Sequence, residues 1–538
     1  MTQSKTFRHS WPCVAILFAV VSVPRAFGNG PDVIKASHND VSHPLSRMAI
    51  SANSSSGGSD SQSIAARPTG PLISNSKSDP VAAPFAGPLT GVTLLSNFDG
   101  QSAQDNRNLF GFAFVPPDTN GAVGATQFVQ MVNVTIAVYD KSTGALLLGP
   151  AAIHTLWQGF GGLCEFGGGT PSFADGGDPV VLYDHLAGRW LVSQLQYNST
   201  FTQTAQCIAV STTSDATGSY NRYEYDFGLN FPDYPKFSVW PDAYYNTINV
   251  FPGKKFAGAQ ACAFDRNAML AGAPASAICF QQPSTVSSLL PADLDGRTLP
   301  PAGSPNYLVG LADSTDLNFF RFHVDFSNPA NSTMTGPTLI PVAPYTEICA
   351  RATTTSCIPE PNPGEKVDGL SDRVMFRLAY RNFGDHESLV VNHTIQGGPL
   401  AGIRWYEIRN PAAPFVYQQS TLVDPNVNYW LGSVAMDKTG NLALGFSVSS
   451  HDVFPSVYVA ARAASDPVGA LSGPLVLVNG SGVQVNSFRR WGDYSSMSVD
   501  PVDDCTFWYT QEYYATTGII NWATRIGAFK FDSCKGRN

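Results

Sequence analysis

Short runs of apolar and aromatic residues alternate with polar turns along most of this chain. From Gly91 onward the runs are separated by Gly, Pro, Asn and Asp, and no stretch keeps the 3.6-residue period of an amphipathic helix. The fullest example is RWGDYSSMSVDPVDDCTFWYTQEYY at residues 490–514. There a turn ending at Asp493 leads into an apolar strand, a second turn at Asp500 and an aromatic strand. The pattern predicts an all-β fold built from hairpins.

The hairpin of residues 490–514 is one copy of a repeat. GDPVVLYDHLAGRWLVSQ has the same frame, with Asp178 and Asp184 at its corners, and GSVAMDKTGNLALGFSV has it with Ser433 in place of the first Asp. A period of about 60 residues fits a four-stranded propeller blade with long loops. The sequence therefore predicts a seven-bladed β-propeller. Six blades remain an alternative, because the start of the fourth repeat, at Asn306, matches the pattern least well. The expected starts of the first strands are Asp118, Asp178, Asp242, Asn306, Asp372, Ser433 and Asp493.

The last repeat is too short to hold four strands. Only about three fit between Asp493 and Phe531, so we expect the strand GVTLLSNF, at residues 91–98, to complete it and close the ring. This divides the chain into a signal peptide (1–28), a disordered low-complexity leader rich in Ser, Asn, Gly and Pro (29–90) and a β-propeller domain (91–538).

The first 28 residues have the form of an export signal. Lys5 and Arg8 precede the apolar run CVAILFAVVSV, and Ala26-Phe27-Gly28 has the small-x-small pattern of a cleavage site. Cleavage removes three basic residues and no acidic one, which takes the formal charge from −9 to −12. We expect a secreted protein, extracellular or periplasmic, without membrane insertion. Its acidity argues against nucleic acid as a partner.

Nine cysteines are present, and one of them, Cys13, lies in the expected signal. The other eight form an even set in an oxidising compartment, which predicts four disulfides. Proximity along the chain favours Cys262 with Cys279, Cys349 with Cys357, and Cys505 with Cys534, and it leaves Cys164 with Cys207, although the sequence does not fix the connectivity.

Equivalent strand starts of a propeller converge at one end of its axis, so the five Asp starts are expected to form a ring of carboxylates. Crowded carboxylates raise one another's pKa, and a protonated carboxyl beside an ionised one is what glycosidic bond cleavage needs. We expect Asp178, Asp242, Asp372 and Asp493 to be catalytic and Asp118 to bind substrate. The alternative for each Asp is a cap on the turn before its strand. No cofactor is required on this reading, although three of these carboxylates could instead hold Ca²⁺.

Basic and aromatic residues flank two of the ring positions. Arg373 follows Asp372, and Arg490 stands close before Asp493, so either guanidinium could orient an acidic sugar or neutralise the ring. Trp240 and Trp491 precede Asp242 and Asp493, where they could stack on sugar faces or pack between blades.

The motifs GDPVVLYD, WPDAYY, MDKTGNLALGFSVSS and RWGDYSSMSVDPVDDCTFWYT resemble those of a group of uncharacterised exported bacterial β-propeller proteins, over residues from about 110 to the C-terminus. The resemblance implies a propeller fold and secretion, and it implies no activity. A looser similarity to sialidase-type propellers rests on residues 214–218 and 465–469, which carry one residue too many for the Asp-box and supply no catalytic residue.

Two functions follow from these features. The first is a carbohydrate-active enzyme, a glycoside hydrolase or a polysaccharide lyase, with its site at the mouth of the central channel. The second is a non-catalytic secreted propeller that binds a surface glycan or protein, in which the Asp residues are structural caps or Ca²⁺ ligands. In either case we expect a monomer whose partner is an extracellular carbohydrate or a surface protein.

Overall fold

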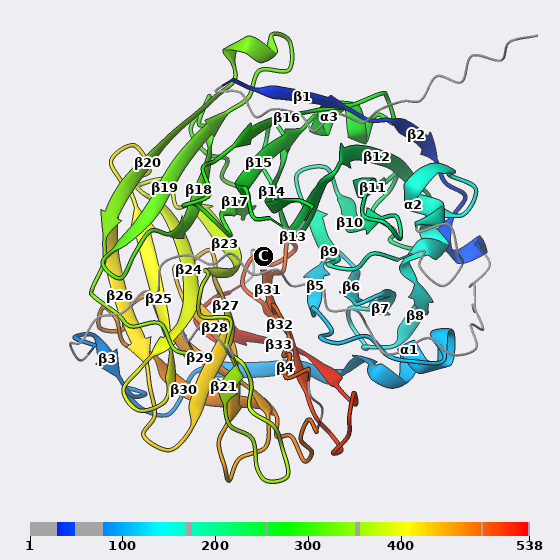
Figure 1. Cartoon of the computed structure of the whole chain (residues 1–538). Coiled ribbons are helices and arrows are strands. Elements are labelled where there is room, and N and C mark those ends of the chain that lie inside the picture. The colour runs from blue at the N-terminus through cyan, green and yellow to red at the C-terminus, as the bar shows by residue number, and fades with distance from the viewer. Residues whose placement is uncertain are drawn as a thin grey trace, which may run out of the picture.

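Seven four-stranded antiparallel meanders stand side by side around a central axis (Figure 1). The structure is a computed structural model that describes residues 30–48, 79–167, 175–253, 255–349, 356–485 and 488–535. The expected β-propeller fold is therefore confirmed. The expected signal peptide, residues 1–28, lies outside the described residues.

We number the meanders in chain order and give their strands from the axis outward. Meander 1 consists of β5 (Asn120–Val123), β6 (Gln127–Val132), β7 (Thr135–Asp140) and β8 (Leu146–Ala152). Meander 2 consists of β9 (Val180–Asp184), β10 (Arg189–Tyr197), β11 (Thr204–Ser211) and β12 (Tyr220–Gly228). Meander 3 consists of β13 (Asn230–Val239), β14 (Tyr244–Pro252), β15 (Gly258–Phe264) and β16 (Ser276–Gln281). Meanders 4 and 5 consist of β17 (Leu290–Asp295), β18 (Asn306–Leu311), β19 (Asp316–His323) and β20 (Thr333–Pro341); and β23 (Met375–Asn382), β24 (Glu387–Gln396), β25 (Ala401–Arg409) and β26 (Phe415–Leu422). Meanders 6 and 7 consist of β27 (Asn428–Met436), β28 (Leu442–Ser449), β29 (Ser456–Arg462) and β30 (Ser472–Val478); and β31 (Ser496–Val499), β32 (Phe507–Tyr513), β33 (Ala523–Phe531) and β4 (Val92–Ser102).

The remaining elements are short and lie outside the meanders. They are the helices α1 (Ala103–Phe110), α2 (Gly162–Phe166) and α3 (Arg266–Leu270), the 3-10 turns Leu45–Arg47, Ile153–Trp157 and Pro329–Asn331, and the strand pair β21 (Ser356–Ile358) and β22 (Val367–Asp368).

The ring closes as the sequence predicts. Strand β4 pairs antiparallel with β33, with Val92 opposite Phe531 and Ser102 opposite Ala523, so the N-terminal side of the chain supplies the outermost strand of meander 7. The disulfide between Cys505 and Cys534 joins the start of β32 to the residues just after β33. Closure of this kind leaves no open side in the ring.

Part of the expected leader is ordered, and for these residues the prediction of disorder is wrong. Residues 32–35 form β1, which pairs with β16, and residues 38–41 form β2, which pairs with β12. Further on, β3 (Ala82–Ala83) pairs with β26. Outer strands of the meanders offer unpaired backbone N–H and C=O groups, and these short segments satisfy them by strand addition, which depends mainly on backbone pairing and needs no long apolar run. Residues 49–78 of the leader lie outside the described residues.

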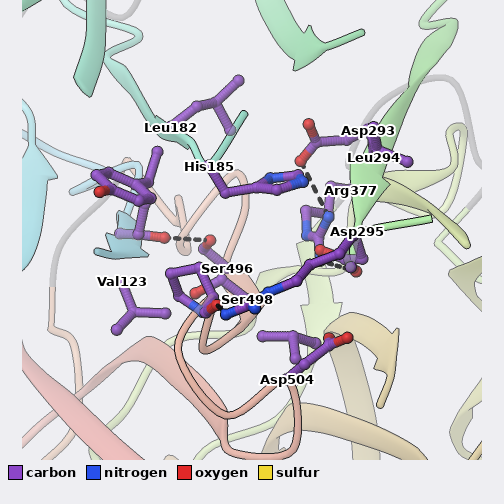
Figure 2. A pocket seen from close by; sticks show the side chains of 17 residues that line it. Val123, Leu182, His185, Asp293, Leu294, Asp295, Arg377, Ser496, Ser498 and Asp504 are labelled. Carbon is purple, nitrogen blue, oxygen red and sulfur yellow. Dashed lines mark hydrogen bonds and ion pairs between the residues drawn. The ribbon is translucent and has the colours of Figure 1, made fainter. Parts of the chain in front are cut away.

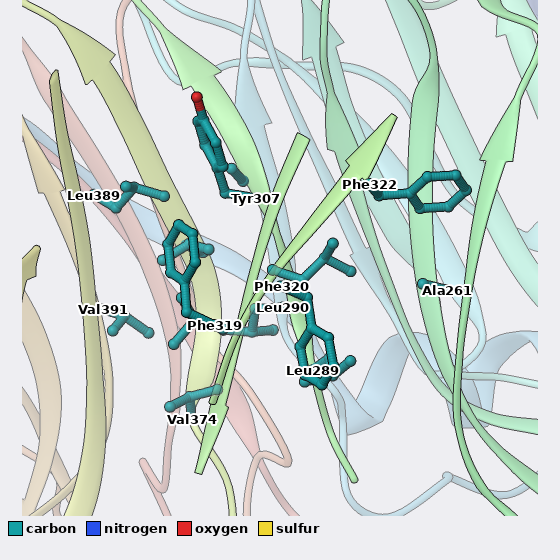
Figure 3. Packing of buried hydrophobic residues seen from close by; sticks show 14 of the residues in the cluster. Ala261, Leu289, Leu290, Tyr307, Phe319, Phe320, Phe322, Val374, Leu389 and Val391 are labelled. Atoms are coloured by element: carbon teal, nitrogen blue, oxygen red, sulfur yellow. The ribbon is translucent and has the colours of Figure 1, made fainter. Parts of the chain in front are cut away.

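Apolar side chains from neighbouring meanders interlock between the sheets. Between meanders 4 and 5, Tyr307 and Phe319 lie near Leu389 and Val391, and all four are buried (Figure 3). Burial of each such side chain contributes roughly 1.5–3 kcal/mol relative to exposure. This packing fixes the angle between meanders and hence the position of each innermost strand at the axis.

Four disulfides join the cysteine pairs that chain proximity favoured: Cys164–Cys207, Cys262–Cys279, Cys349–Cys357 and Cys505–Cys534. Disulfides of this number are typical of proteins outside the reducing cytoplasm. Within the part of the chain that the structure describes, no helix has the length and apolar character that a membrane crossing requires.

Candidate active site

The innermost strands define two ends of the ring. We call the end where they begin the starting end, and the end where they turn into the second strands the hairpin end. A non-glycine residue with positive φ stands two or three residues before four innermost strands, namely Asp118 (49°), Asp178 (48°), Ser288 (47°) and Asp493 (54°), and lies within the first half of two others, namely Tyr234 (55°) in β13 and Leu431 (51°) in β27. Asp tolerates this left-handed conformation better than most residues. The repeat thus places a side chain at the axis in each of these meanders, and in meanders 7, 1 and 2, which are neighbours in the closed ring, that side chain is a carboxylate.

Asp118 is the most enclosed of the three carboxylates. The residue is 2% exposed, and its Oδ1 has no hydrogen-bond partner among the described residues. Burial raises its pKa well above the ordinary value, and the charges of Asp493 and Asp178 raise it further, while Arg490 and Lys236 oppose the shift. Asp118 therefore tends to hold a proton at neutral pH.

Asp178 is hydrogen-bonded to Asp118, which requires a proton on one of the two carboxyls. Its Oδ2 also accepts the backbone N–H of Tyr234 at 3.1 Å, and its own N–H donates to Asn133 Oδ1 at 3.0 Å. Burial raises the pKa of Asp178, while Lys236 lowers it. The two carboxyls form a pair that shares a proton.

Meander 3 adds three groups that the sequence analysis did not single out. Asp233 has its pKa raised to about 8, first by burial and then by Asp178. Lys236 is fully buried, and its Nζ lies 3.6 Å from the ring centroids of both Tyr234 and Tyr494. Burial lowers the pKa of Lys236 to about 8, against the opposing effect of Asp178, Asp118 and Asp493. The hydroxyl of Tyr234 is buried without a hydrogen-bond partner among the described residues.

The two arginines that the sequence singled out are engaged by carboxylates. Arg373 donates from Nε and Nη2 to the two carboxyl oxygens of Asp372, each at 2.9 Å, and its guanidinium lies 4.4 Å from the ring centroid of Tyr234. Arg490 forms an ion pair with Asp493 through Nη2. Both pairs belong to the starting end. The charges of Arg373 and Asp372 shift the pKa of Tyr234, and the charge of Arg490 lowers the pKa of Asp118. Of the expected ring, Asp118, Asp178, Asp372, Asp493, Arg373 and Arg490 thus lie together.

Three residues that the sequence placed at the starts of innermost strands do not join this cluster. Asp242 belongs to the turn between β13 and β14, at the hairpin end, where Tyr245 Oη donates to its carboxyl oxygens at 3.2 and 3.3 Å. The position equivalent to Asp178 in meander 3 is Tyr234.

Asn306 begins β18, the second strand of meander 4. Its side chain accepts the backbone N–H of Ala292 at 3.2 Å and donates to the backbone C=O of the same residue at 2.8 Å. Ser433 lies within β27, two positions after Leu431, and its Oγ accepts the N–H of Met497 at 3.0 Å.

The expectation that Trp240 and Trp491 line the mouth is wrong. Trp240 is 1% exposed and packs edge-on against Tyr307 and Tyr380, and Trp491 is 0% exposed and stacks on Tyr514. Neither ring has a free face for a sugar. A propeller packs large aromatic side chains between its sheets, and that demand places both residues in the core.

A cavity lies at the hairpin end (Figure 2). Arg377 bridges two of its carboxylates, with Nη1 3.0 Å from Asp293 Oδ2 and Nη2 on Asp295 Oδ2. Arg381, next to the cavity, binds both carboxyl oxygens of Asp504 at 3.0 and 2.7 Å. His185 also lines the cavity. Its Nε2 is buried without a partner among the described residues, and burial lowers its pKa, so the ring is neutral there.

Among the described residues, no group of three or more His, Cys, Asp or Glu side chains is arranged to hold a metal ion. At the starting end the positive charge next to the carboxylates is supplied by Lys236, Arg373 and Arg490. The site can hold and release protons, and it offers buried carboxyl and phenol oxygens to a ligand.

No family model matches the chain, and no curated protein matches it in sequence. Solved structures to which it is similar include the α-L-arabinanase of Penicillium chrysogenum complexed with arabinobiose, at 8% identity over 82% of this chain and 100% of that chain, with a TM-score of 0.37. They also include the endo-arabinase of Bacteroides thetaiotaomicron VPI-5482, at 10% identity over 64% and 92%, TM-score 0.28, and the N-terminal domain of Nup159, at 8% identity over 83% and 98%, TM-score 0.33. At these values the likenesses carry no conclusion about activity or about the site.

Proposed function

We propose that this protein is a secreted glycoside hydrolase that acts on extracellular carbohydrate at the starting end of the ring. The observation that carries the proposal is Asp118, a buried carboxyl beside Asp178 and Asp493, one oxygen of which has no hydrogen-bond partner in the described part of the chain. A carboxyl kept protonated next to an ionised one is the pair of groups that glycosidic hydrolysis requires.

In the proposed reaction Asp118 gives its proton to the glycosidic oxygen as the bond from that oxygen to the anomeric carbon breaks. A second carboxylate, Asp493, either attacks the anomeric carbon or takes the proton of the attacking water, whereas Asp178 is hydrogen-bonded to Asp118 and stands too close to it for either role. A separation of about 5–5.5 Å between the two carboxyls leads to retention of configuration, and about 6.5–9.5 Å to inversion. The stereochemistry of the first product therefore distinguishes the two routes.

The charge pattern favours hydrolysis of a neutral sugar over cleavage of an acidic one. A lyase needs a base opposite a cation that neutralises the uronate, but Arg373 and Arg490 are bound to Asp372 and Asp493. Burial raises the pKa values of Tyr234 and Tyr494, which makes both phenols poor bases. These ion pairs leave little positive charge for a carboxylated substrate.

The same ion pairs favour the second candidate function, a non-catalytic propeller that binds a surface glycan or protein. In that case Asp372 and Asp493 serve to hold Arg373 and Arg490, and the cluster stabilises the ring. Asp118 and Tyr234 each have a buried oxygen without a partner among the residues that the structure describes, and these oxygens favour the enzyme, because a purely structural cluster has no need of them.

An assay of the mature protein on a broad panel of polysaccharides, with detection of both reducing ends and unsaturated products, tests the proposal. The variants Asp118→Asn and Asp178→Asn are compared with Asp242→Asn, which makes the same chemical change at the hairpin end. New reducing ends that the first two variants lose and the third keeps would support the hydrolase. Unsaturated products would indicate a lyase, and silence on the whole panel with binding retained would favour the second function.

The proposal includes export, a monomeric state and no requirement for a cofactor. Export accords with the export signal expected at residues 1–28 and with the four disulfides. N-terminal sequencing of the secreted protein and its mass in solution test the first two points.

A further inference from the structure

Lys236 occupies a position that the fold itself fills with an apolar residue. Tyr234-Pro235-Lys236 in meander 3 corresponds to Asp178-Pro179-Val180 in meander 2, since each triplet begins with a positive-φ residue followed by proline. Val180 is fully buried, and so is Lys236. The valine at the equivalent position shows that this part of the strand folds without a positive charge. The lysine is therefore not required by the fold.

The backbone directs Lys236 toward the axis. The register of β13 against β14 shifts between Asp233 and Lys236, so Tyr234 and Pro235 form a bulge at the starting end. Bulges of this kind change the direction of a side chain next to functional sites. The N–H of Tyr234 in the same bulge donates to Asp178, which ties the lysine's strand to the carboxyl pair.

The ammonium of Lys236 is held by two aromatic rings. Its Nζ lies 3.6 Å from the centroids of Tyr234 and Tyr494 and donates to the carbonyl oxygen of Pro235 at 3.0 Å. A desolvated cation over an aromatic face is attracted to the ring, and the two rings, one from meander 3 and one from meander 7, fix the position of the ammonium. The lysine is therefore a fixed charge with little freedom to reach solvent.

The charges around Lys236 balance only if one carboxyl of the cluster stays protonated. Asp118, Asp178 and Asp493 face two cations, Lys236 and Arg490. The pair Asp372 and Arg373 is balanced in itself, and Asp233, whose pKa is raised to about 8, is a fourth carboxyl that is itself protonated at neutral pH and adds no charge to these three. The phenols of Tyr234 and Tyr494 are neutral. With three carboxyls and two cations, the neutral arrangement has one proton, and Asp118 is the most buried place for it.

We propose that Lys236 is a positioning residue of the site: its ammonium, clamped between Tyr234 and Tyr494, is the counter-charge that keeps Asp178 ionised while Asp118 holds the proton. This rests on the proposed function in one respect, since the arrangement serves to keep an acid and a base side by side. Removal of the positive charge leaves one cation for three carboxyls, and a second carboxyl then takes up a proton at neutral pH.

The test measures carboxyl protonation directly and does not depend on activity. Infrared titration of the whole mature protein follows the band of protonated carboxyl groups, and the difference between wild type and Asp118→Asn identifies the contribution of Asp118. In Lys236→Met the band at neutral pH is expected to grow by about one carboxyl, and its midpoint to move up by about 1–3 pH units, the shift that a close opposite charge produces. Lys236→Arg keeps the charge and is expected to titrate like wild type.

Lys236→Gln gives a second neutral variant, in case the methionine variant does not fold. A folded neutral variant that titrates like wild type overturns the proposal, and so does a Lys236→Arg variant that titrates like the neutral ones. Where the panel assay gives activity, the pH at which the rate rises moves up in Lys236→Met. A shifted band in a protein with no activity leaves the role of Lys236 as counter-charge standing and overturns the proposed function alone.

Discussion

The two ends of the axis carry similar residues in opposite arrangements. At the hairpin end Arg377 binds both Asp293 and Asp295, and Arg381 binds Asp504, so each of these carboxylates is in direct contact with a guanidinium. At the starting end Asp118 and Asp178 face each other, and the oxygen that Asp118 leaves unpaired is buried. Paired charges stabilise a fold when their geometry is good, whereas like charges crowded together cost free energy.

That difference separates a structural cluster from a candidate site. Both ends are built from the same innermost strands, and both are buried. At the hairpin end Asp295 raises the pKa of Asp293, but Arg377, which contacts both carboxylates, lowers it more strongly. At the starting end Asp493 and Asp178 raise the pKa of Asp118 more strongly than Arg490 and Lys236 lower it, which is where function is expected to accept a cost in stability. The predictions below test this contrast.

The largest effect is expected from the loss of Arg377. Arg377→Met leaves Asp293 and Asp295 buried without a counter-charge, which costs about 3–5 kcal/mol of the free energy of unfolding. Denaturant unfolding measures the loss. Arg297→Met, which removes an exposed arginine from the same cavity, serves as the control and should change stability little. Equal stability of the two variants would show that the hairpin end is not held by this ion bridge.

At the starting end, Asp118→Asn is expected to keep the fold and lose the reaction. Removal of a general acid lowers kcat by about 10²–10⁴-fold. Free energy of unfolding should fall little or rise, because one member of a crowded set of acids is gone. If kcat falls only in proportion to a loss of folded protein, Asp118 is structural.

The pH dependence of stability is expected to reflect the acids of the starting end. A carboxyl whose pKa is higher in the folded than in the unfolded state stabilises fully below its unfolded pKa, near 4, and this contribution is lost as pH rises through the folded pKa, about 8 for Asp233. Stability should therefore decline between about pH 5 and 8, by at most about 1.4 kcal/mol per pH unit for each such group. Asp233→Asn should make the decline shallower, whereas Asp226→Asn, an exposed Asp of β12, should leave it unchanged.

The smallest effect is expected from metal removal. If Lys236, Arg373 and Arg490 supply the positive charge of the starting end, dialysis against a chelator should change neither the midpoint of thermal unfolding nor the activity by a measurable amount. A fall in the midpoint that Ca²⁺ restores would show that the carboxylates hold a cation, as the sequence alternative allowed.

The fold follows from the sequence because it is repetitive. A hairpin with Asp at its corners recurs every 60 residues or so, and the short last copy indicates that a strand such as GVTLLSNF must close the ring. Added edge strands such as β1 and β2 leave no such signal, since their contribution is backbone pairing and their side chains are largely polar.

The sequence predicted the residues of the site in the repeats that have Asp near the start of the innermost strand. It did not predict them in the repeat that has another residue there. Asp118, Asp178 and Asp493 stand in equivalent positions, whereas meander 3 has Tyr234 there, so a search for Asp found Asp242, in the turn at the other end of the same strand. Alignment of Tyr234-Pro235 with Asp178-Pro179 would have located both Tyr234 and Lys236. The burial of Trp240 and Trp491 depends on packing between sheets, which local sequence does not record.

The most direct test of the account is a crystal structure of Asp118→Asn soaked with oligosaccharides from the polysaccharide panel. The account predicts a sugar at the starting end, with its glycosidic oxygen near residue 118 and its anomeric carbon facing Asp493. A sugar bound in the cavity beside His185, or only on the outer strands of the meanders, would contradict it.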